Sequence, residues 1–217
     1  MGVDGLEKHE DCSRRSAETF SIGSFVVPAI FVIIFYSVTI VAHKCGFSED
    51  MSGLVGGAWT LFAMLIACHI MQVDFTCPDR GGILTAIGVG ILLQAISIAI
   101  IALFSQVDVS DTVTMTIPYL IRLFLVDPVA EELCFRGAML QGLTRRGSIL
   151  PFWLANAIQA ALFGVIHGNP VQIAYAFMCG LVLGGLRQQN GITSAITAHC
   201  VCNLSGVVLG LVIGVLS

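Results

Sequence analysis

Charged residues are scarce in this chain. Aspartate, glutamate, lysine and arginine make up 11% of its 217 residues, whereas 56% are hydrophobic. Soluble domains carry about 25% charged and about 45–50% apolar residues. A soluble core of this size cannot cover so many apolar side chains, so the composition indicates a protein embedded in a bilayer rather than an ordinary soluble domain.

Basic stripes and cysteine pairs are missing as well. The net charge is −4, and a nucleic-acid-binding protein would show a basic patch or stripe. The eight cysteines form no CxxC pair, and most lie in apolar runs, where cysteine behaves as a small hydrophobic residue. We therefore expect no nucleic-acid partner and no disulfide framework.

Long apolar stretches account for most of the chain. About 20 mostly apolar residues are needed to cross a bilayer. Seven stretches qualify, namely Ile22–Ala42, Met51–Val73, Ile83–Gln106, Met115–Gln141, Leu150–His167, Val171–Leu186 and Ile192–Leu216. We therefore predict an all-α fold, a polytopic membrane bundle of about seven transmembrane helices. The long fourth span should kink at Pro128, because proline cannot donate to the preceding turn.

Basic residues are unevenly distributed among the predicted loops. If the N-terminus is cytoplasmic, only Lys44 lies on the outer side. The cytoplasmic side then carries Lys8, Arg14, Arg15, Arg80, Arg145, Arg146 and Arg187. Cytoplasmic loops carry an excess of lysine and arginine. We therefore predict a multi-pass protein whose tail, residues 1–21, lies in the cytoplasm and whose C-terminus lies outside.

Ionisable residues inside the spans are concentrated in the fourth. The first three spans contain only His69 well within them. The fourth contains Arg122, Asp127, Glu131, Glu132 and Arg136. Charge within a bilayer is costly and indicates a functional site by default.

The two adjacent glutamates should have different partners. Glu132 and Arg136 are four residues apart, so on a helix they share a face and can pair. Glu131 points about 100° away, which leaves it free for proton transfer. Asp127, four residues before Glu131, either adds to this site or caps the helix beside Pro128.

Three polar residues in later spans complete a candidate site. His167 ends the fifth span, His199 lies seven residues into the seventh, and Asn203 follows His199 on the same helix face. We predict that they share a site with Glu131. At 1.5 Å per residue, the two histidines would differ in depth by about 10–15 Å. Convergence therefore requires a tilted or shifted fifth helix, or a Gly168–Pro170 turn sunk within the protein.

These residues resemble the motifs of the CPBP intramembrane proteases, an Abi-type family that includes CAAX-processing endopeptidases and bacteriocin-processing relatives. EExxxR stands at Glu131–Arg136, FxxxH at Phe163–His167 and HxxxN at His199–Asn203. The resemblance covers about 80 residues, from Asp127 to Gly206, and leaves the first three spans uncovered.

The resemblance implies an intramembrane endopeptidase. Its substrate would be a membrane-associated peptide or protein, with either a prenylated CAAX-type tail or a leader peptide. By this analogy Glu131 and His167 activate a water, His199 and Asn203 hold that water or stabilise the oxyanion, and Glu132 and Arg136 support the site. Residues 22–114 would then form three accessory helices, and residues 115–217 a catalytic four-helix core.

The metal requirement is open. Glu131, His167 and His199 would supply two histidines and one carboxylate for zinc, with a position left for water. Neither histidine lies in an HExxH motif, and asparagine is a poor zinc ligand. We therefore favour a glutamate mechanism without a cofactor, with zinc as the alternative.

Two other functions suit the same residues. A proton-coupled transporter or channel also places Glu and His within the membrane, although no inverted repeat relates the two halves. A non-catalytic membrane protein of the bacteriocin-immunity type would keep the fold, but the intact set Glu131, His167, His199 and Asn203 favours an active enzyme.

Overall fold

The computed structural model describes residues 3–104, 115–145, 150–168 and 170–216, with side chains for 23–100, 115–145, 150–168 and 170–209. Every regular element in these ranges is a helix, which confirms the predicted all-α membrane bundle. Five of the helices are long and apolar enough to cross a membrane.

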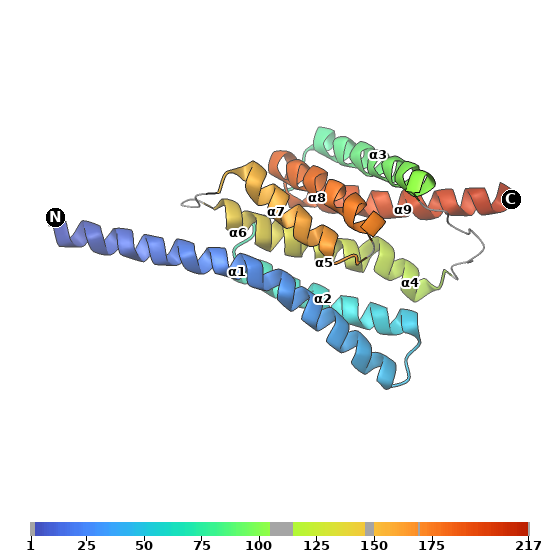
Figure 1. The fold of residues 1–217 in the computed structure, drawn as a ribbon, viewed down its shortest axis with the longest axis horizontal. Coiled ribbons are helices and arrows are strands. Elements are labelled where there is room, and N and C mark those ends of the chain that lie inside the picture. The colour runs from blue at the N-terminus through green and yellow to red at the C-terminus, as the bar shows by residue number, and fades with distance from the viewer. Residues whose placement is uncertain (1–2, 105–114, 146–149, 169, 217) are drawn as a thin grey trace.

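The first three helices are regular. They are α1 (Val3–Lys44), α2 (Glu49–Ile70) and α3 (Arg80–Phe104). The helix α1 runs without interruption from the predicted N-terminal tail through the first span, so its N-terminal half projects beyond the bundle (Figure 1). The Ser48 side chain accepts a hydrogen bond from the Met51 N–H and caps the start of α2.

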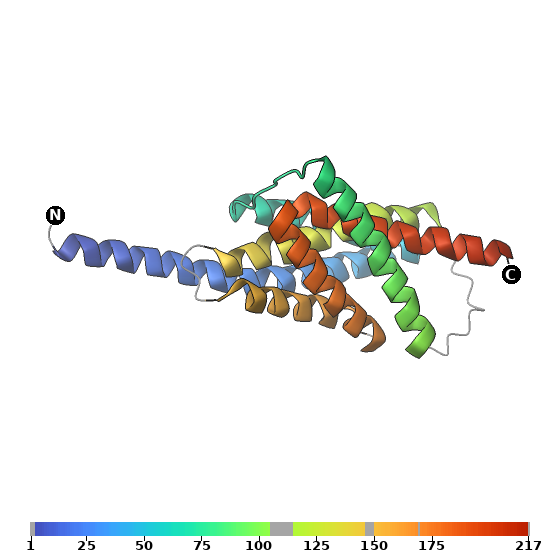
Figure 2. The ribbon, with the colours of Figure 1, turned by 90° about the horizontal axis from the view of Figure 1, so that it is seen from above.

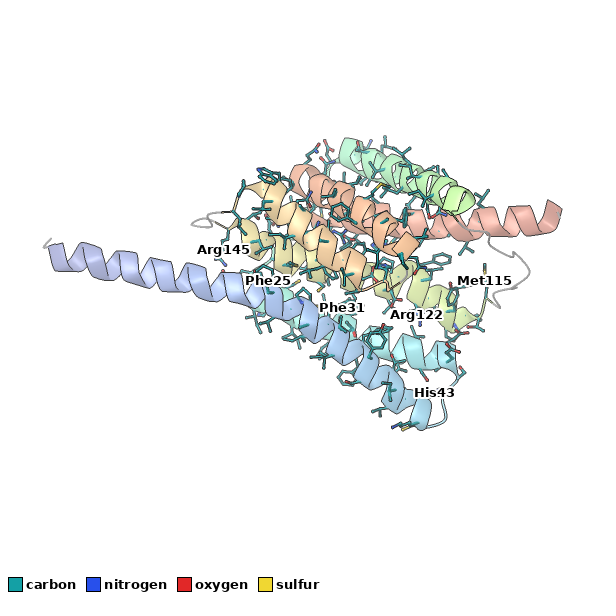
Figure 3. All side chains as sticks on the ribbon, viewed as in Figure 1. Phe25, Phe31, His43, Met115, Arg122 and Arg145 are labelled. Atoms are coloured by element: carbon teal, nitrogen blue, oxygen red, sulfur yellow. The ribbon has the colours of Figure 1, made fainter. Side chains whose placement is uncertain are left out.

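The fourth predicted span is a helix interrupted by π-helical turns. It runs through α4 (Ile117–Ile121), η1 (Arg122–Val126), α5 (Asp127–Glu132), η2 (Leu133–Met139) and α6 (Leu140–Thr144). In η1 the Asp127 N–H donates to the Arg122 carbonyl, five residues back. The disruption predicted at Pro128 thus takes the form of a widened turn directly before it. Met115 and Arg145 lie at the two ends of this interrupted helix (Figure 3).

The last three helices depart from the predicted bounds in two cases. They are α7 (Phe152–Val165), α8 (Pro170–Asn190) and α9 (Ile192–Leu216). The prediction for α9 is confirmed, but α7 has only 14 residues, about 21 Å. The predicted break at Arg187–Gly191 is wrong at its start, because α8 continues to Asn190 and ends at Gly191, whose φ is +85°.

The seven expected spans correspond to seven helical segments among the described residues, five of which satisfy both the length and the composition of a membrane-spanning helix. Neither the interrupted fourth helix nor α7 is among the five helices that satisfy both length and composition. The interrupted helix fails because it is divided into short segments, and α7 because it is too short. Both are nevertheless apolar elements packed within the bundle.

The interrupted helix occupies the middle of the bundle. The pair α1 and α2 packs on one side of it, α7 packs on α8, and α9 contacts α5 and η1 (Figure 1). The helix α3 lies outside and crosses over α9 (Figure 2). Residues 132–140 are all buried, so the charged motif of the fourth span stands in the core.

Candidate active site

A buried ion pair forms the base of the site. Glu132 Oε1 accepts a hydrogen bond from Arg136 Nη1 at 2.8 Å, and neither side chain is exposed. The Arg136 guanidinium also lies over the Phe163 ring, 4.3 Å from its centroid. The predicted pairing of these two residues is therefore present, and it keeps Arg136 away from Glu131.

His199 joins the two glutamates. Its Nδ1 lies 2.9 Å from Glu132 Oε1, and its Nε2 lies 3.7 Å from Glu131 Oε2. The same Glu132 oxygen accepts from Arg136 Nη1, so we assign it as the acceptor for His199 as well, with the proton on His199 Nδ1. The Nε2 atom is therefore directed toward Glu131, whose side chain is 17% exposed.

His167 reaches the same place from a turn. Its Nδ1 lies 2.8 Å from the Phe163 carbonyl, which can only accept, so this nitrogen also carries the proton. The Phe163 ring lies 4.9 Å from the His167 ring and 6.1 Å from the His199 ring. Both histidine rings therefore pack against Phe163, and His167 does so from the turn that follows α7.

Asn203 has a backbone partner. Its Nδ2 donates to the carbonyl of Leu123 in η1 at 2.9 Å. In η1 the Asp127 N–H is directed to Arg122, and Pro128 has no N–H, so the Leu123 carbonyl lacks both of its ordinary helical donors. The Asn203 amide supplies the missing hydrogen bond and ties α9 to the widened turn.

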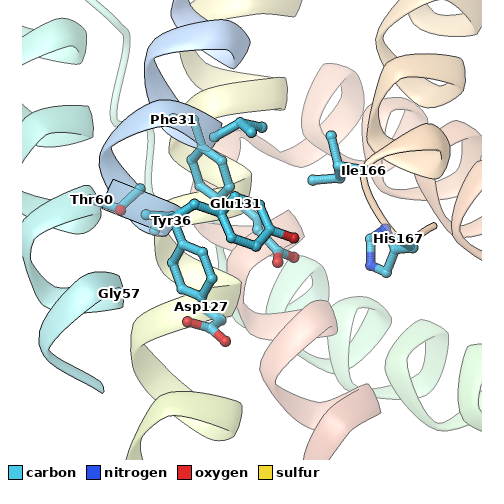
Figure 4. Close-up of a pocket in the computed structure, with 11 residues that line it drawn as sticks. Phe31, Tyr36, Gly57, Thr60, Asp127, Glu131, Ile166 and His167 are labelled. Atoms are coloured by element: carbon cyan, nitrogen blue, oxygen red, sulfur yellow. The ribbon is translucent and has the colours of Figure 1, made fainter. Parts of the chain in front are cut away.

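A cavity of about 120 Å³ lies beside these groups (Figure 4). Asp127, Glu131 and His167 line its polar part. Its other lining residues are Phe31, Val32, Phe35 and Tyr36 of α1, Gly57 and Thr60 of α2, Ala130 and Ile166. The structure thus brings Glu131 and His167 to one cavity, with His199 in contact with Glu131 and Asn203 held at η1.

Asp127 belongs to the cavity and does not cap a helix. Its side chain makes no capping hydrogen bond, and its Oδ2 lies 3.1 Å from Arg122 Nε. The pair packs against α2 where Gly53 and Gly57 leave room, since a Cβ at Gly57 would lie 2.9 Å from Asp127 Oδ1. Of the two interpretations of Asp127, the structure supports participation in the site.

The contribution of α1 and α2 was missed by the sequence analysis. Both helices were assigned an accessory role, yet they provide most of the apolar cavity wall. The Gly53/Gly57 spacing was a usable signal, because small residues four apart let membrane helices approach closely. No such pattern identified Phe31, Phe35 or Tyr36.

The candidate zinc ligands do not form a ligand set. Within the part of the chain that the structure describes, no three His, Cys, Asp or Glu side chains stand close enough together to hold a metal ion. This includes Glu131, His167 and His199. The arrangement seen is instead a carboxylate and two imidazoles around a cavity, which suits proton transfer to and from a water.

Residues 113–205 match the family model described as type II CAAX prenyl endopeptidase, Rce1-like. This segment is similar to the Rce1-like family. The resemblance drawn from the three motifs is thereby confirmed for this part of the chain, which holds Glu131, His167, His199 and Asn203. The match covers less than half of the chain and leaves α1, α2 and α3 outside. No curated protein and no solved structure matches the chain.

Proposed function

We propose that this protein is an intramembrane endopeptidase that cleaves lipidated peptides or proteins at a C-terminal CAAX segment, after its prenylated cysteine. One observation carries the proposal: Glu131 and His167 line one cavity, and His199 contacts Glu131. All three lie in the segment matched by the prenyl endopeptidase family.

Glu131 acts as the general base. It takes a proton from a water in the cavity, and the resulting hydroxide attacks the carbonyl carbon of the scissile bond. His167, across the cavity, holds this water together with Glu131 (Figure 4). When the tetrahedral intermediate collapses, the C–N bond breaks and Glu131 returns its proton to the leaving amine. The products are a new carboxylate and a free amine.

The remaining polar residues position this pair. Arg136 fixes Glu132, and Glu132 fixes the His199 ring by accepting its Nδ1–H. When His199 also carries a proton on Nε2, this N–H stands beside Glu131 and the reacting atoms, where it donates to the developing oxyanion. Asn203 acts through η1, because its amide holds the turn that precedes Asp127 and Glu131.

The reaction uses no metal. The placement of Glu131 and His167 on one cavity, together with the lack of an HExxH motif in the sequence, supports this mechanism. We expect full cleavage by protein purified in a chelator, with no zinc detected by elemental analysis. Loss of cleavage that zinc alone restores would contradict it.

The N-terminus lies in the cytoplasm. The excess of basic residues on one side, with Lys44 alone on the other, supports this orientation. The last turn of α8 carries Arg187, and α3 begins at Arg80, so the helix ends agree with the distribution predicted from the sequence.

The decisive experiment compares the wild type with Glu131→Gln in liposomes, using a farnesylated Cys-a-a-X peptide. We expect Glu131→Gln to lose at least about 100-fold in kcat, since general acid–base catalysis contributes about 10²–10⁴-fold. Unfolding temperature should change little, because the Glu131 side chain is partly exposed and its contact with His199 Nε2 is long, at 3.7 Å.

The matched control is Glu49→Gln, an exposed carboxylate in the first turn of α2. It should leave cleavage intact. If the wild type cleaves a leader peptide but no prenylated peptide, the proposed CAAX substrate is wrong and a leader peptide is the substrate. Unaltered cleavage by Glu131→Gln would contradict the mechanism.

A further inference from the structure

The cavity beside Glu131 has a wall that comes from outside the family segment. The helix α1 contributes Phe31, Val32, Phe35 and Tyr36, whereas the matched segment begins only at residue 113. Thr60 of α2 is buried at the same wall. The family segment therefore supplies the polar groups of the cavity, whereas α1 and α2 supply most of its apolar wall.

The size of the cavity limits what it can hold. Its volume is about 120 Å³. An apolar protein cavity of about 150 Å³ takes up benzene. The volume therefore matches one branched or small apolar side chain, whereas an isoprenoid chain, several times larger than benzene, would extend well beyond the cavity.

The cavity has both polar and apolar lining groups. The carboxyl groups of Asp127 and Glu131 and the His167 ring are exposed to the cavity, and aromatic and aliphatic groups form most of its remaining wall (Figure 4). A peptide backbone reaching Glu131 would place one neighbouring side chain against the apolar wall. An acidic side chain would meet two carboxyl groups and would be rejected.

We propose that this cavity is the subsite for the residue directly after the modified cysteine, and that Phe35 sets the size limit of that subsite. The inference rests on the proposed function. The modified cysteine itself is too large for the cavity, so the residue on the other side of the scissile bond is the occupant. The lipid then lies elsewhere along the bundle.

Phe35 is the residue of the wall best suited to a test. Phe31 belongs to the buried core and packs edge-on against Phe135, with ring centroids 6.1 Å apart. Phe35 is half-buried and lies outside that core. Truncating Phe35 therefore enlarges the cavity and leaves the Phe31–Phe135 contact in place.

The experiment measures kcat/KM in liposomes for farnesylated Cys-x-a-X peptides in which x is Ala, Val, Leu, Phe or Asp. The wild type should favour Val and Leu over Phe and should reject Asp. In Phe35→Ala, kcat/KM for the peptide with x = Phe, divided by kcat/KM for the peptide with x = Val, should rise at least about 10-fold. One methylene in a hydrophobic pocket changes discrimination by about 10–200-fold.

The matched control is Phe25→Ala. Phe25 is an exposed phenylalanine earlier on α1 and is not part of the cavity lining (Figure 3). It should leave the Phe to Val ratio at its wild-type value. Equal ratios in Phe35→Ala and Phe25→Ala, or a wild type indifferent to the size of x, would overturn the subsite.

The two experiments test the subsite and the catalytic mechanism independently. If Glu131→Gln loses cleavage and the ratio does not move in Phe35→Ala, only the subsite fails. If Glu131→Gln still cleaves, the catalytic proposal fails whatever the ratio does. A large shift in the ratio, together with dependence on Glu131, supports both.

Discussion

At the scale of single residues, two adjacent glutamates have different environments because neighbouring side chains point about 100° apart around a helix. Glu132 is fully buried and holds both Arg136 and His199, whereas Glu131 keeps one distant histidine contact and faces a cavity. Removing one member of a buried ion pair costs about 3–5 kcal/mol. Glu132 therefore stabilises the site, whereas Glu131 is available to react.

A substitution at Asn203 can distinguish a positioning role of this residue from a direct catalytic one. Replacing Asn203 by Leu removes the donor and leaves the Leu123 carbonyl unpaired, which should cost about 1–3 kcal/mol of folding free energy. Because η1 carries the turn before Glu131, kcat should also fall at least about tenfold. Thermal unfolding in detergent and peptide cleavage measure the two effects.

The control for this change is Thr197→Val. It removes a hydrogen bond of 2.8 Å to the Thr193 carbonyl within α9, and so loses a donor without loosening η1. We expect little change in kcat. If Asn203→Leu lowered kcat at wild-type stability, Asn203 would be a direct oxyanion donor and its positioning role would be contradicted.

Side-chain pairs could be predicted from the sequence only where the backbone keeps the regular spacing of an α-helix. The Glu132–Arg136 pair follows from a spacing of four residues, and it was found. Arg122 and Asp127 are five residues apart, and their pairing accompanies a π-helical turn that an α-helical projection does not contain. The same turn leaves the Leu123 carbonyl free, so the partner of Asn203 could not be read from spacing.

At the scale of elements, Pro128 maintains the widened turn. Alanine there would restore an N–H that can donate to Phe124, four residues back, and favour the α-helical register. Proline is about 3 kcal/mol less favourable than alanine within a helix, so we expect Pro128→Ala to raise stability. Cleavage should fall several-fold, because Arg122 and Leu123 would shift. Thermal unfolding and cleavage assays test both directions.

Pro118→Ala is the control for this substitution. Pro118 lies in the first turn of α4, where a backbone N–H has no helical partner in any case. Neither stability nor cleavage should change appreciably. Full cleavage by Pro128→Ala would show that the widened turn is dispensable.

The α7–α8 contact depends on glycine at position 180. A Cβ at Gly180 would lie 2.7 Å from the Cβ of Ala160 on α7. Overpacking of this kind costs about 1–3 kcal/mol, so Gly180→Ala should lower the unfolding temperature. Gly185 has nothing within 4 Å of such a Cβ, so Gly185→Ala should be neutral or slightly stabilising. Equal effects of the two would contradict this packing.

Helix bounds were predictable only where apolar character and helical structure end together. They coincide in α9, which has the predicted bounds. They differ in α8, because the polar residues after Leu186 continue the helix until Gly191 ends it with a positive φ. Hydropathy locates the membrane-facing part of a helix and is insensitive to its polar ends.

At the scale of the whole molecule, the site combines a family segment with helices that lie outside it. The motifs of the fourth, fifth and seventh spans identified the chemical groups. They carried no information on α1 and α2, because which helices pack together in a bundle is a long-range property absent from any single motif. The aromatic wall of α1 is accordingly the part of the site that only the structure supplies.

The orientation of the whole bundle can be tested with two native cysteines. Cys45 follows α1 and Cys77 precedes α3, both are exposed, and one helix, α2, separates them. With a cytoplasmic N-terminus, Cys45 faces outward and Cys77 inward. In a Cys12→Ser background, a membrane-impermeant maleimide applied to intact cells should label Cys45. Adding Cys45→Ser should abolish this labelling, and adding Cys77→Ser should not. The reverse pattern would place Lys44 in the cytoplasm, against the excess of basic residues on the other side, and would contradict the proposed topology.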